Sequence, residues 1–418
     1  MKEIKHRKTG FVAVALPVLL GLYLMLFGLT SRGECAEKAA SFLCLADYTG
    51  PVAAISVPLV KGETDYFKEV NARGGINGIK INFINIDTRY NVARAVSAYR
   101  RYRKGHKVLV ADFHSTPFGK ALGRDTKRDK IFGLYPGDGE VQGKDLPGFN
   151  WGTTYQDSFA ACLDWIIKDW KEKGTGGRPK VGYLSWDSAY GRESLRGGKE
   201  YADTLPLTLL KPEFFPVGSL DHTVYLQRLA KNGANYIFIG GVDPTPTNIM
   251  KDAYRMRITK NIQFINNSFW GPTKSVGVRM HPEKVNNVVR ASFFIVGEEA
   301  EKHPAHKLWL KHRPNEPISD LTGAYYIGVA LAKDFEAGLK VALKNVSYED
   351  LDGEVLADAY KQLTGSPHRE GLTGACAFSP TNHRGSMEVK FYRIENGKIN
   401  RISDWVKVPD AVSMHKWD

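Results

Sequence analysis

Cysteine is scarce in this chain, with only four among 418 residues. So few cysteines, without metal-ligand spacing, exclude a disulfide framework and a zinc module of the usual kind. Cys35 lies in an N-terminal segment that we expect to be removed, which leaves Cys44, Cys162 and Cys376. One disulfide among these three is compatible with an oxidising compartment, and the sequence does not choose the pair.

Catalytic signatures are also missing. The sequence contains no GxSxG nucleophile elbow, no HExxH zinc motif and no Walker phosphate loop. One group of glycines lacks the dinucleotide-binding spacing: Gly137, Gly139 and Gly143. Three histidines near a helical pattern have no carboxylate or cysteine at ligand spacing, which is typical of a solvated face: His303, His306 and His312. We therefore expect a protein that is not an enzyme and has no metal or other cofactor.

The charge balance is basic, with a formal net charge of +13. Lys and Arg are scattered rather than gathered in a stripe with aromatic residues, so the sequence does not predict a nucleic-acid partner.

A basic start followed by the apolar run 11–29 is typical of a secretory signal, with cleavage near Ala36. We therefore predict export to the periplasm. The run of 19 residues is also long enough to cross a bilayer, so an uncleaved anchor over 1–36 stays open.

Short apolar runs alternate with helical patterns from residue 41 onward, and this alternation predicts an α/β fold with parallel sheets. The Gly- and Pro-rich stretch 174–179 separates two similar halves, as though a second sheet begins there. Strands are expected at 41–48, 79–87, 107–113, 130–135, 180–186, 235–241, 261–270 and 288–296. Helices are expected at 51–71, 91–104, 156–173, 221–232 with Asp221 as N-cap, 320–343 and 348–363.

Two turns have specific residue signals. Gly74, Gly75, Asn77 and Gly78 tolerate positive φ, which predicts a sharp reversal between a helix and a strand. Asn396-Gly397 between two alternating runs predicts a β-hairpin.

Four stretches in this order carry a family likeness: LADYTGPVA, VNARGGINGIKI, WDSAYGRE and SPTNHRG. Together they resemble the type I periplasmic substrate-binding proteins of ABC transporters, in particular the branched-chain amino acid-binding family, over residues 42–408. The resemblance implies a type I periplasmic-binding-protein fold of two doubly wound lobes with parallel sheets joined by a multi-strand hinge. The expected N-terminal lobe comprises 42–157 and 298–386, and the C-terminal lobe comprises 158–297 and 387–418.

The same resemblance implies a monomer that captures an amino acid, or a related small polar or carboxylate ligand, by lobe closure. Such a protein delivers its ligand to an ABC transporter permease in the membrane. The alternative is a membrane-anchored flytrap sensor that acts with a separate signalling partner.

Candidate ligand residues follow predicted strands, because open α/β sheets bind ligands at the carboxyl ends of their strands. Ser115 and Thr116 open a helix, whose N-terminus suits a carboxylate; a capping role alone is the alternative. His114 is beside them. Asp138 and Asp243 are carboxylates at strand ends that can pair with an ammonium group.

Further candidates rest mainly on the resemblance, which places Tyr48 and Thr49 in a loop open to the cleft and Tyr190 over the ligand. The acidic residue expected after a later strand is replaced by Asn266 and Asn267, and these amides with Trp270 suit an amide or a planar ligand. Tyr155 is a candidate hinge or cleft residue.

Overall fold

The computed structural model describes residues 37–144, 146–267, 270–318 and 321–417. The predicted leader or anchor at 1–36 lies outside these residues. One compact unit extends from Ala39 to the C-terminus. None of the helices in the described part of the chain combines the length and hydrophobicity needed to cross a bilayer.

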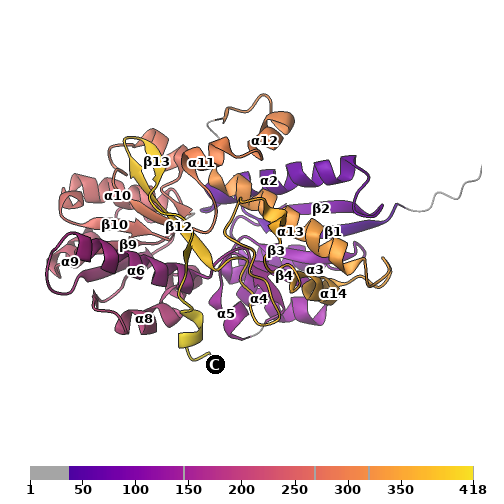
Figure 1. The fold of residues 1–418 in the computed structure, drawn as a ribbon, viewed down its shortest axis with the longest axis horizontal. Coiled ribbons are helices and arrows are strands. Elements are labelled where there is room, and N and C mark those ends of the chain that lie inside the picture. The colour runs from indigo at the N-terminus through magenta and orange to yellow at the C-terminus, as the bar shows by residue number, and fades with distance from the viewer. Residues whose placement is uncertain (1–36, 145, 268–269, 319–320, 418) are drawn as a thin grey trace, which may run out of the picture. The chain divides into compact units, whose positions relative to one another are not determined.

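The first sheet is wholly parallel, as the alternating pattern predicts, and its strands come from the first part of the chain (Figure 1). Sequential strands lie on both sides of β1, which makes the sheet doubly wound. Its order is β2 (Lys80–Asp87), β1 (Ala39–Ala46), β3 (Val108–Phe113), β4 (Phe132–Tyr135) and β5 (Gly148–Asn150).

The second sheet is mixed. Its parallel part repeats the pattern of the first, and the antiparallel hairpin β12–β13 extends it past β11. The order is β13 (Lys398–Arg401), β12 (Glu388–Glu395), β11 (Val289–Ser292), β10 (Gln263–Asn266), β9 (Tyr236–Ile239), β6 (Lys180–Trp186) and β7 (Thr208–Leu209). Two short strands join at the side: β8 (Glu213–Phe215) pairs with β6, and β14 (Val406–Lys407) pairs with β12.

Helices connect the strands. Those of the first half are α2 (Ala53–Ala72), α3 (Val92–Tyr102), α4 (Thr116–Arg128) and α5 (Gly139–Gly143). The second half contains α6 (Tyr155–Glu172), α7 (Ala189–Glu193), α8 (Leu195–Asp203), α9 (Thr223–Lys231) and α10 (Thr245–Arg255). The last group is α11 (Gly297–Lys302), α12 (His306–His312), α13 (Gly323–Ala342) and α14 (Gly353–Tyr360).

The late helix α13 returns to the first sheet and packs along α2 (Figure 1). Phe335 of α13 lies 5.4 Å from Phe42 of β1 and 5.8 Å from Phe67 of α2, measured between ring centroids. The backbones approach closely because glycine occupies the contact: a Cβ on Gly328 would lie 2.0 Å from the Leu59 carbonyl oxygen. The chain therefore crosses between the sheets more than twice, and the proposed lobe boundaries stay a prediction.

Both turn predictions are confirmed. Gly74, Gly75, Asn77 and Gly78 all have positive φ, and they reverse the chain between α2 and β2. Asn396 and Gly397 also have positive φ and join β12 to β13 as a two-residue hairpin.

Some predicted boundaries are wrong. The N-cap of α9 is His222 rather than Asp221, although the Asp221 carboxylate does accept the Thr223 N–H at 2.8 Å. The helix predicted at 348–363 is shorter, because the Asp352 carboxylate accepts the Val355 N–H and starts α14 there. The open disulfide question is also answered: Cys44, Cys162 and Cys376 are free, buried thiols.

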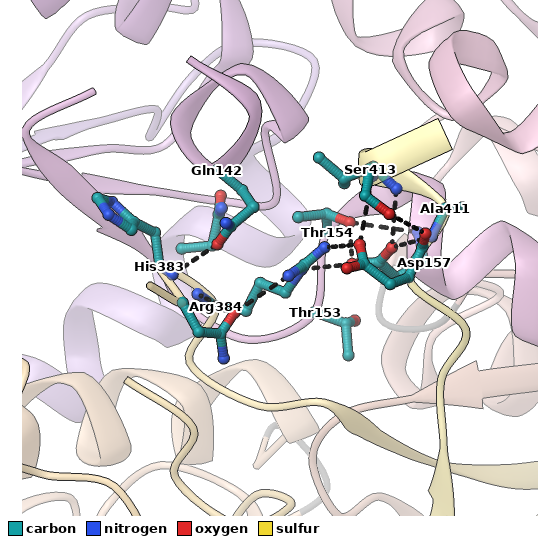
Figure 2. A network of polar contacts seen from close by, with 12 residues as sticks. Gln142, Thr153, Thr154, Asp157, His383, Arg384, Ala411 and Ser413 are labelled. Atoms are coloured by element: carbon teal, nitrogen blue, oxygen red, sulfur yellow. Dashed lines mark hydrogen bonds and ion pairs between the residues drawn. The ribbon is translucent and has the colours of Figure 1, made fainter. Parts of the chain in front are cut away.

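A buried polar network joins the start of α6 to two late segments (Figure 2). Asp157 accepts hydrogen bonds from Thr154 Oγ1 at 2.5 Å, from Arg384 Nε at 2.7 Å and from the Ala411 N–H at 2.8 Å. Arg384 also pairs with Asp410. Since Asp157 and Arg384 are buried, their pairing fixes the HRG turn and the C-terminal segment against the crossover between the sheets.

The close approach of α2 and α13 predicts the effect of one added methyl group. We expect Gly328→Ala to destabilise the protein by about 1–3 kcal/mol, since the new Cβ meets backbone that cannot rotate away. Urea denaturation measures the difference. Gly176→Ala is the matched control, because a Cβ there meets nothing within 4 Å. Equal loss in both variants would contradict the packing account.

Candidate functional site: an aromatic cavity between the two sheets

A small cavity of about 30 Å³ lies where strands of both sheets end. The first sheet contributes residues that follow β2, β3, β4 and β5, and the second sheet contributes residues that follow β6, β9 and β10. The start of α2 and the first residue of α6 complete the wall. The lining residues are Val52, Ile55, Ser56, Tyr90, His114, Ser115, Thr116, Pro136, Trp151, Tyr155, Tyr190, Val242 and Trp270.

Aromatic rings from both sheets meet around this cavity. Tyr155 and Tyr190 form an edge-to-face pair with ring centroids 5.1 Å apart. Trp151, after β5, lies 6.3 Å from Trp270, after β10. Tyr90, after β2, reaches toward the second sheet, with its ring 6.5 Å from that of Trp186. These faces offer apolar area in fixed orientations, which suits a flat, apolar ligand group.

Two hydroxyls at the N-terminus of α4 supply the polar part of the wall. Ser115 is the N-cap residue, yet its side chain makes no capping hydrogen bond. Neither the Ser115 nor the Thr116 hydroxyl has a hydrogen-bond partner among the described residues, and both side chains are buried. These hydroxyls therefore do not act as helix caps, which was the alternative to a ligand-binding role. Two neighbouring buried hydroxyls that can both donate hydrogen bonds form a suitable binding place for a carboxylate.

The structure brings half of the predicted site residues to one cavity: His114, Ser115, Thr116, Tyr155, Tyr190 and Trp270. His114 is held through its Nδ1 atom, which lies 2.6 Å from Ser56 Oγ. The Tyr190 hydroxyl points toward the second sheet, 3.5 Å from the Gly241 carbonyl oxygen.

The other predicted residues do not line the cavity, and several of them bind side chains or backbone elsewhere. The Tyr48 hydroxyl donates a hydrogen bond to Asn85 Oδ1 at 2.5 Å, and the Thr49 hydroxyl donates one to Asp87 Oδ2 at 2.9 Å. The Asp243 carboxylate accepts both the Thr247 and Thr273 hydroxyls at 2.6 Å, which leaves it a local structural role. The Asn266 amide donates to the Ile239 carbonyl at 2.7 Å, and the neighbouring Asn267 is buried.

Asp138 is buried at the start of α5, close to α4. Burial, together with the nearby Glu193, raises the pKa of its carboxyl to about 8, while the positive charge of Lys120 opposes the shift. Its two carboxyl oxygens have no hydrogen-bond partner within the described residues. If Asp138 is protonated at neutral pH, it carries no charge and is a poor partner for an ammonium group. The position of Asp138 at a strand end predicted such a pairing.

Sequence reasoning missed Tyr90, Trp151 and Ser56. Tyr90 lies three residues beyond β2 with φ of 56°, a conformation that no sequence pattern around it signals. Trp151 follows β5, a strand of three residues that is too short to stand out as a periodic run. Ser56 lies inside α2 rather than after a strand.

One group of metal-ligating side chains also exists among the described residues, where the sequence analysis expects none. Cys44, Glu63, Asp112 and His114 are all buried, and their ligand atoms lie within 4.8 Å of one another. They come from β1, α2 and β3 with its following loop, so no local spacing in the sequence could show them.

The family model described as "Periplasmic binding protein" matches residues 44–398. The chain belongs to this family of periplasmic binding proteins. The match covers most of the chain and includes every residue of the cavity wall, so the resemblance drawn from the four sequence stretches is confirmed. No curated protein sequence matches the chain.

Solved structures share the fold of this periplasmic binding protein at low sequence identity. A branched-chain amino acid ABC transporter protein from Thermus thermophilus with bound valine has a TM-score of 0.78 and 18% identity, and the alignment covers 90% of this chain and 98% of that one. A substrate-binding protein of an ABC transporter from Aeropyrum pernix has a TM-score of 0.76 and 20% identity, over 90% and 98% of the two chains.

A third structure is a solute-binding protein of an ABC transporter from Rhodopseudomonas palustris HaA2 in complex with p-hydroxybenzoic acid. Its TM-score is 0.72 with 15% identity, over 90% of this chain and 98% of that chain. These likenesses confirm the predicted type I periplasmic-binding fold.

The raised pKa of Asp138 predicts a pH dependence of the stability of this periplasmic binding protein. As the pH rises above the ordinary aspartate value of 3.8, the unfolded chain releases the proton while the folded protein keeps it up to about pH 8. Stability therefore falls by about 1.4 kcal/mol per pH unit across that window through this group, and the loss ends above it.

Asp138→Asn removes this contribution, so its urea unfolding free energy should fall less steeply with pH than that of the wild type. Asp187→Asn is the control, because the Asp187 side chain is 58% exposed. Parallel pH profiles for wild type and Asp138→Asn would refute the buried, protonated carboxyl.

Proposed function

We propose that this chain is the extracytoplasmic solute-binding component of an ABC importer, and that its solute is a small carboxylate with an aromatic or other flat apolar body. The observation that carries the proposal is the cavity itself. Aromatic rings from both sheets surround it, and two buried hydroxyls at the start of α4, which have no hydrogen-bond partner among the described residues, provide its anion-binding end.

The choice of carboxylate over amino acid rests on charge. Among the described residues that line the cavity there is no Asp or Glu. An α-ammonium group enclosed there would lack a carboxylate partner, and a buried charge without a partner is costly. Asp243, one of the two carboxylates predicted for that role, accepts hydrogen bonds from the Thr247 and Thr273 hydroxyls instead. The complex of the Rhodopseudomonas palustris protein with p-hydroxybenzoic acid supports the choice, since a protein of the same fold binds an aromatic acid.

Lobe closure and delivery complete the proposal. The cavity wall comes from both sheets, so a ligand that contacts all of it stabilises the arrangement in which the strand ends face each other. The lobes are those predicted from the sequence, 42–157 with 298–386 and 158–297 with 387–418. The closed form is then recognised by a membrane permease, to which the monomeric binding protein releases its solute unchanged.

A thermal-shift comparison of two matched probes tests the ligand class. Phenylalanine and 3-phenylpropionate share the ring, the chain and the carboxylate and differ only in the ammonium group. We expect 3-phenylpropionate, and 4-hydroxybenzoate with it, to raise the melting temperature in a concentration-dependent way, because a ligand that binds only the folded state stabilises it by mass action. Phenylalanine should give a markedly smaller shift. A larger shift with phenylalanine would contradict the proposed ligand class.

Two substitutions test the cavity wall. Ser115→Ala removes one hydrogen bond to the carboxylate and Tyr190→Ala removes one ring face, and each should weaken binding of the carboxylate probe roughly 10- to 100-fold. Tyr254→Ala is the matched control, since Tyr254 lies on α10 and is 45% exposed. Calorimetric titration gives the affinities. Unchanged affinity in both cavity variants would remove this cavity as the binding site.

A further inference from the structure

Four buried side chains converge at His114, a residue that also lines the aromatic cavity. Cys44 comes from β1, Glu63 from α2 and Asp112 from β3, and His114 directly follows that strand. Cys44, Glu63 and Asp112 are 0% exposed, and His114 is 7% exposed. One ligand atom from each lies within 4.8 Å of the other three.

Two of the six separations among these ligand atoms are close to the edge lengths of a coordination tetrahedron. His114 Nε2 lies 3.1 Å from Asp112 Oδ2 and 3.3 Å from Cys44 Sγ. Zinc bond lengths of about 2.0–2.3 Å imply ligand-to-ligand separations of roughly 3.3–3.6 Å in a tetrahedral site. These two separations are close to the tetrahedral values, and the other four do not exceed 4.8 Å, so side-chain shifts of about 1 Å would let the four atoms surround a cation.

Glu63 gives independent evidence for a missing partner. Neither of its carboxyl oxygens has a hydrogen-bond partner among the described residues, although the residue is completely buried. A buried carboxylate without a partner is unfavourable, whereas a divalent cation satisfies both its charge and its lone pairs.

Neighbouring residues hold two of the four side chains in the orientation that a cation needs. Ser56 Oγ lies 2.6 Å from His114 Nδ1 and also accepts the Asp47 N–H, so His114 presents Nε2 to the cluster. Trp151 Nε1 donates to Asp112 Oδ1 at 2.7 Å, which leaves Oδ2 for the cluster. Metal-binding histidines and carboxylates are commonly oriented by hydrogen bonds of this kind.

We infer that Cys44, Glu63, Asp112 and His114 bind one divalent transition-metal ion, with Zn²⁺ the best match to a donor set of one sulfur, one nitrogen and two carboxylate oxygens. Four protein ligands close the coordination shell, so the ion is structural rather than catalytic. It ties β1, α2 and β3 together beside the cavity and fixes His114, which lines the ligand-binding wall. This inference does not depend on the identity of the transported solute.

Cobalt substitution tests the site directly. The purified full-length protein is treated with a chelator, titrated with Co²⁺, and followed by absorption spectroscopy. We expect binding of one Co²⁺ per chain with a near-ultraviolet thiolate-to-cobalt band and visible bands of tetrahedral cobalt, both displaced by Zn²⁺. Added Zn²⁺ should also raise the melting temperature of the chelated protein.

Two pairs of variants make the assignment specific. Cys44→Ser should abolish the thiolate band, whereas Cys162→Ser should keep it, because both thiols are fully buried but only Cys44 belongs to the cluster. Glu63→Gln should weaken Co²⁺ binding at least tenfold, whereas Glu354→Gln, on exposed α14 surface, should not. A thiolate band that survives in Cys44→Ser, or a wild-type protein that binds no Co²⁺ and gains no stability from Zn²⁺, would overturn the assignment and leave two buried carboxyls that share protons.

Discussion

The arrangement on which the rest depends is the meeting of strand ends from two separate sheets at one cavity. Helices cover the faces of a parallel sheet, so ligands bind at the carboxyl ends of its strands, where the loops leave the sheet. In this chain the residues after seven strands reach the same wall. Neither sheet alone provides an enclosed site, because Trp151 and His114 belong to one and Tyr190 and Trp270 to the other. Binding therefore requires the rest of the chain to hold the two sheets in the correct relative position.

Buried ion pairs contribute to holding the two sheets in this relative position. Asp157 at the start of α6 is paired with Arg384 from the HRG turn, and the same carboxylate accepts N–H groups of the C-terminal segment (Figure 2). Within the first sheet, α13 is pressed against α2 through glycine contacts and a cluster of phenylalanine rings. The proposed metal ion acts in the same layer, where β1, α2 and β3 meet beside His114. These ties connect segments that are far apart in the sequence, so the cavity is a property of the whole fold.

Local signals in the sequence were sufficient for most of the fold. The GGING turn, the Asn396-Gly397 hairpin and the strand of 180–186 follow from residues that act over a few positions, and the structure has each of them.

The site was only partly predictable. Ser115 and Tyr190 stand at strand ends that the pattern shows, but Trp151 follows a three-residue strand and Tyr90 depends on a positive φ. Asp243 was misleading, since its partners Thr247 and Thr273 are brought to it by tertiary packing. The cluster around Glu63 is assembled by tertiary packing, because its four residues come from β1, α2 and the end of β3.

The central claim is that one ligand is held at the same time by loops of both sheets, and hydrogen exchange with and without 3-phenylpropionate tests it most directly. The account predicts slower amide exchange at 114–119 at the start of α4 and, over the same range of ligand concentration, at 187–191 and 240–242 in the second sheet. Protection limited to one sheet, or protection that saturates at different concentrations in the two sheets, would contradict a shared site between them.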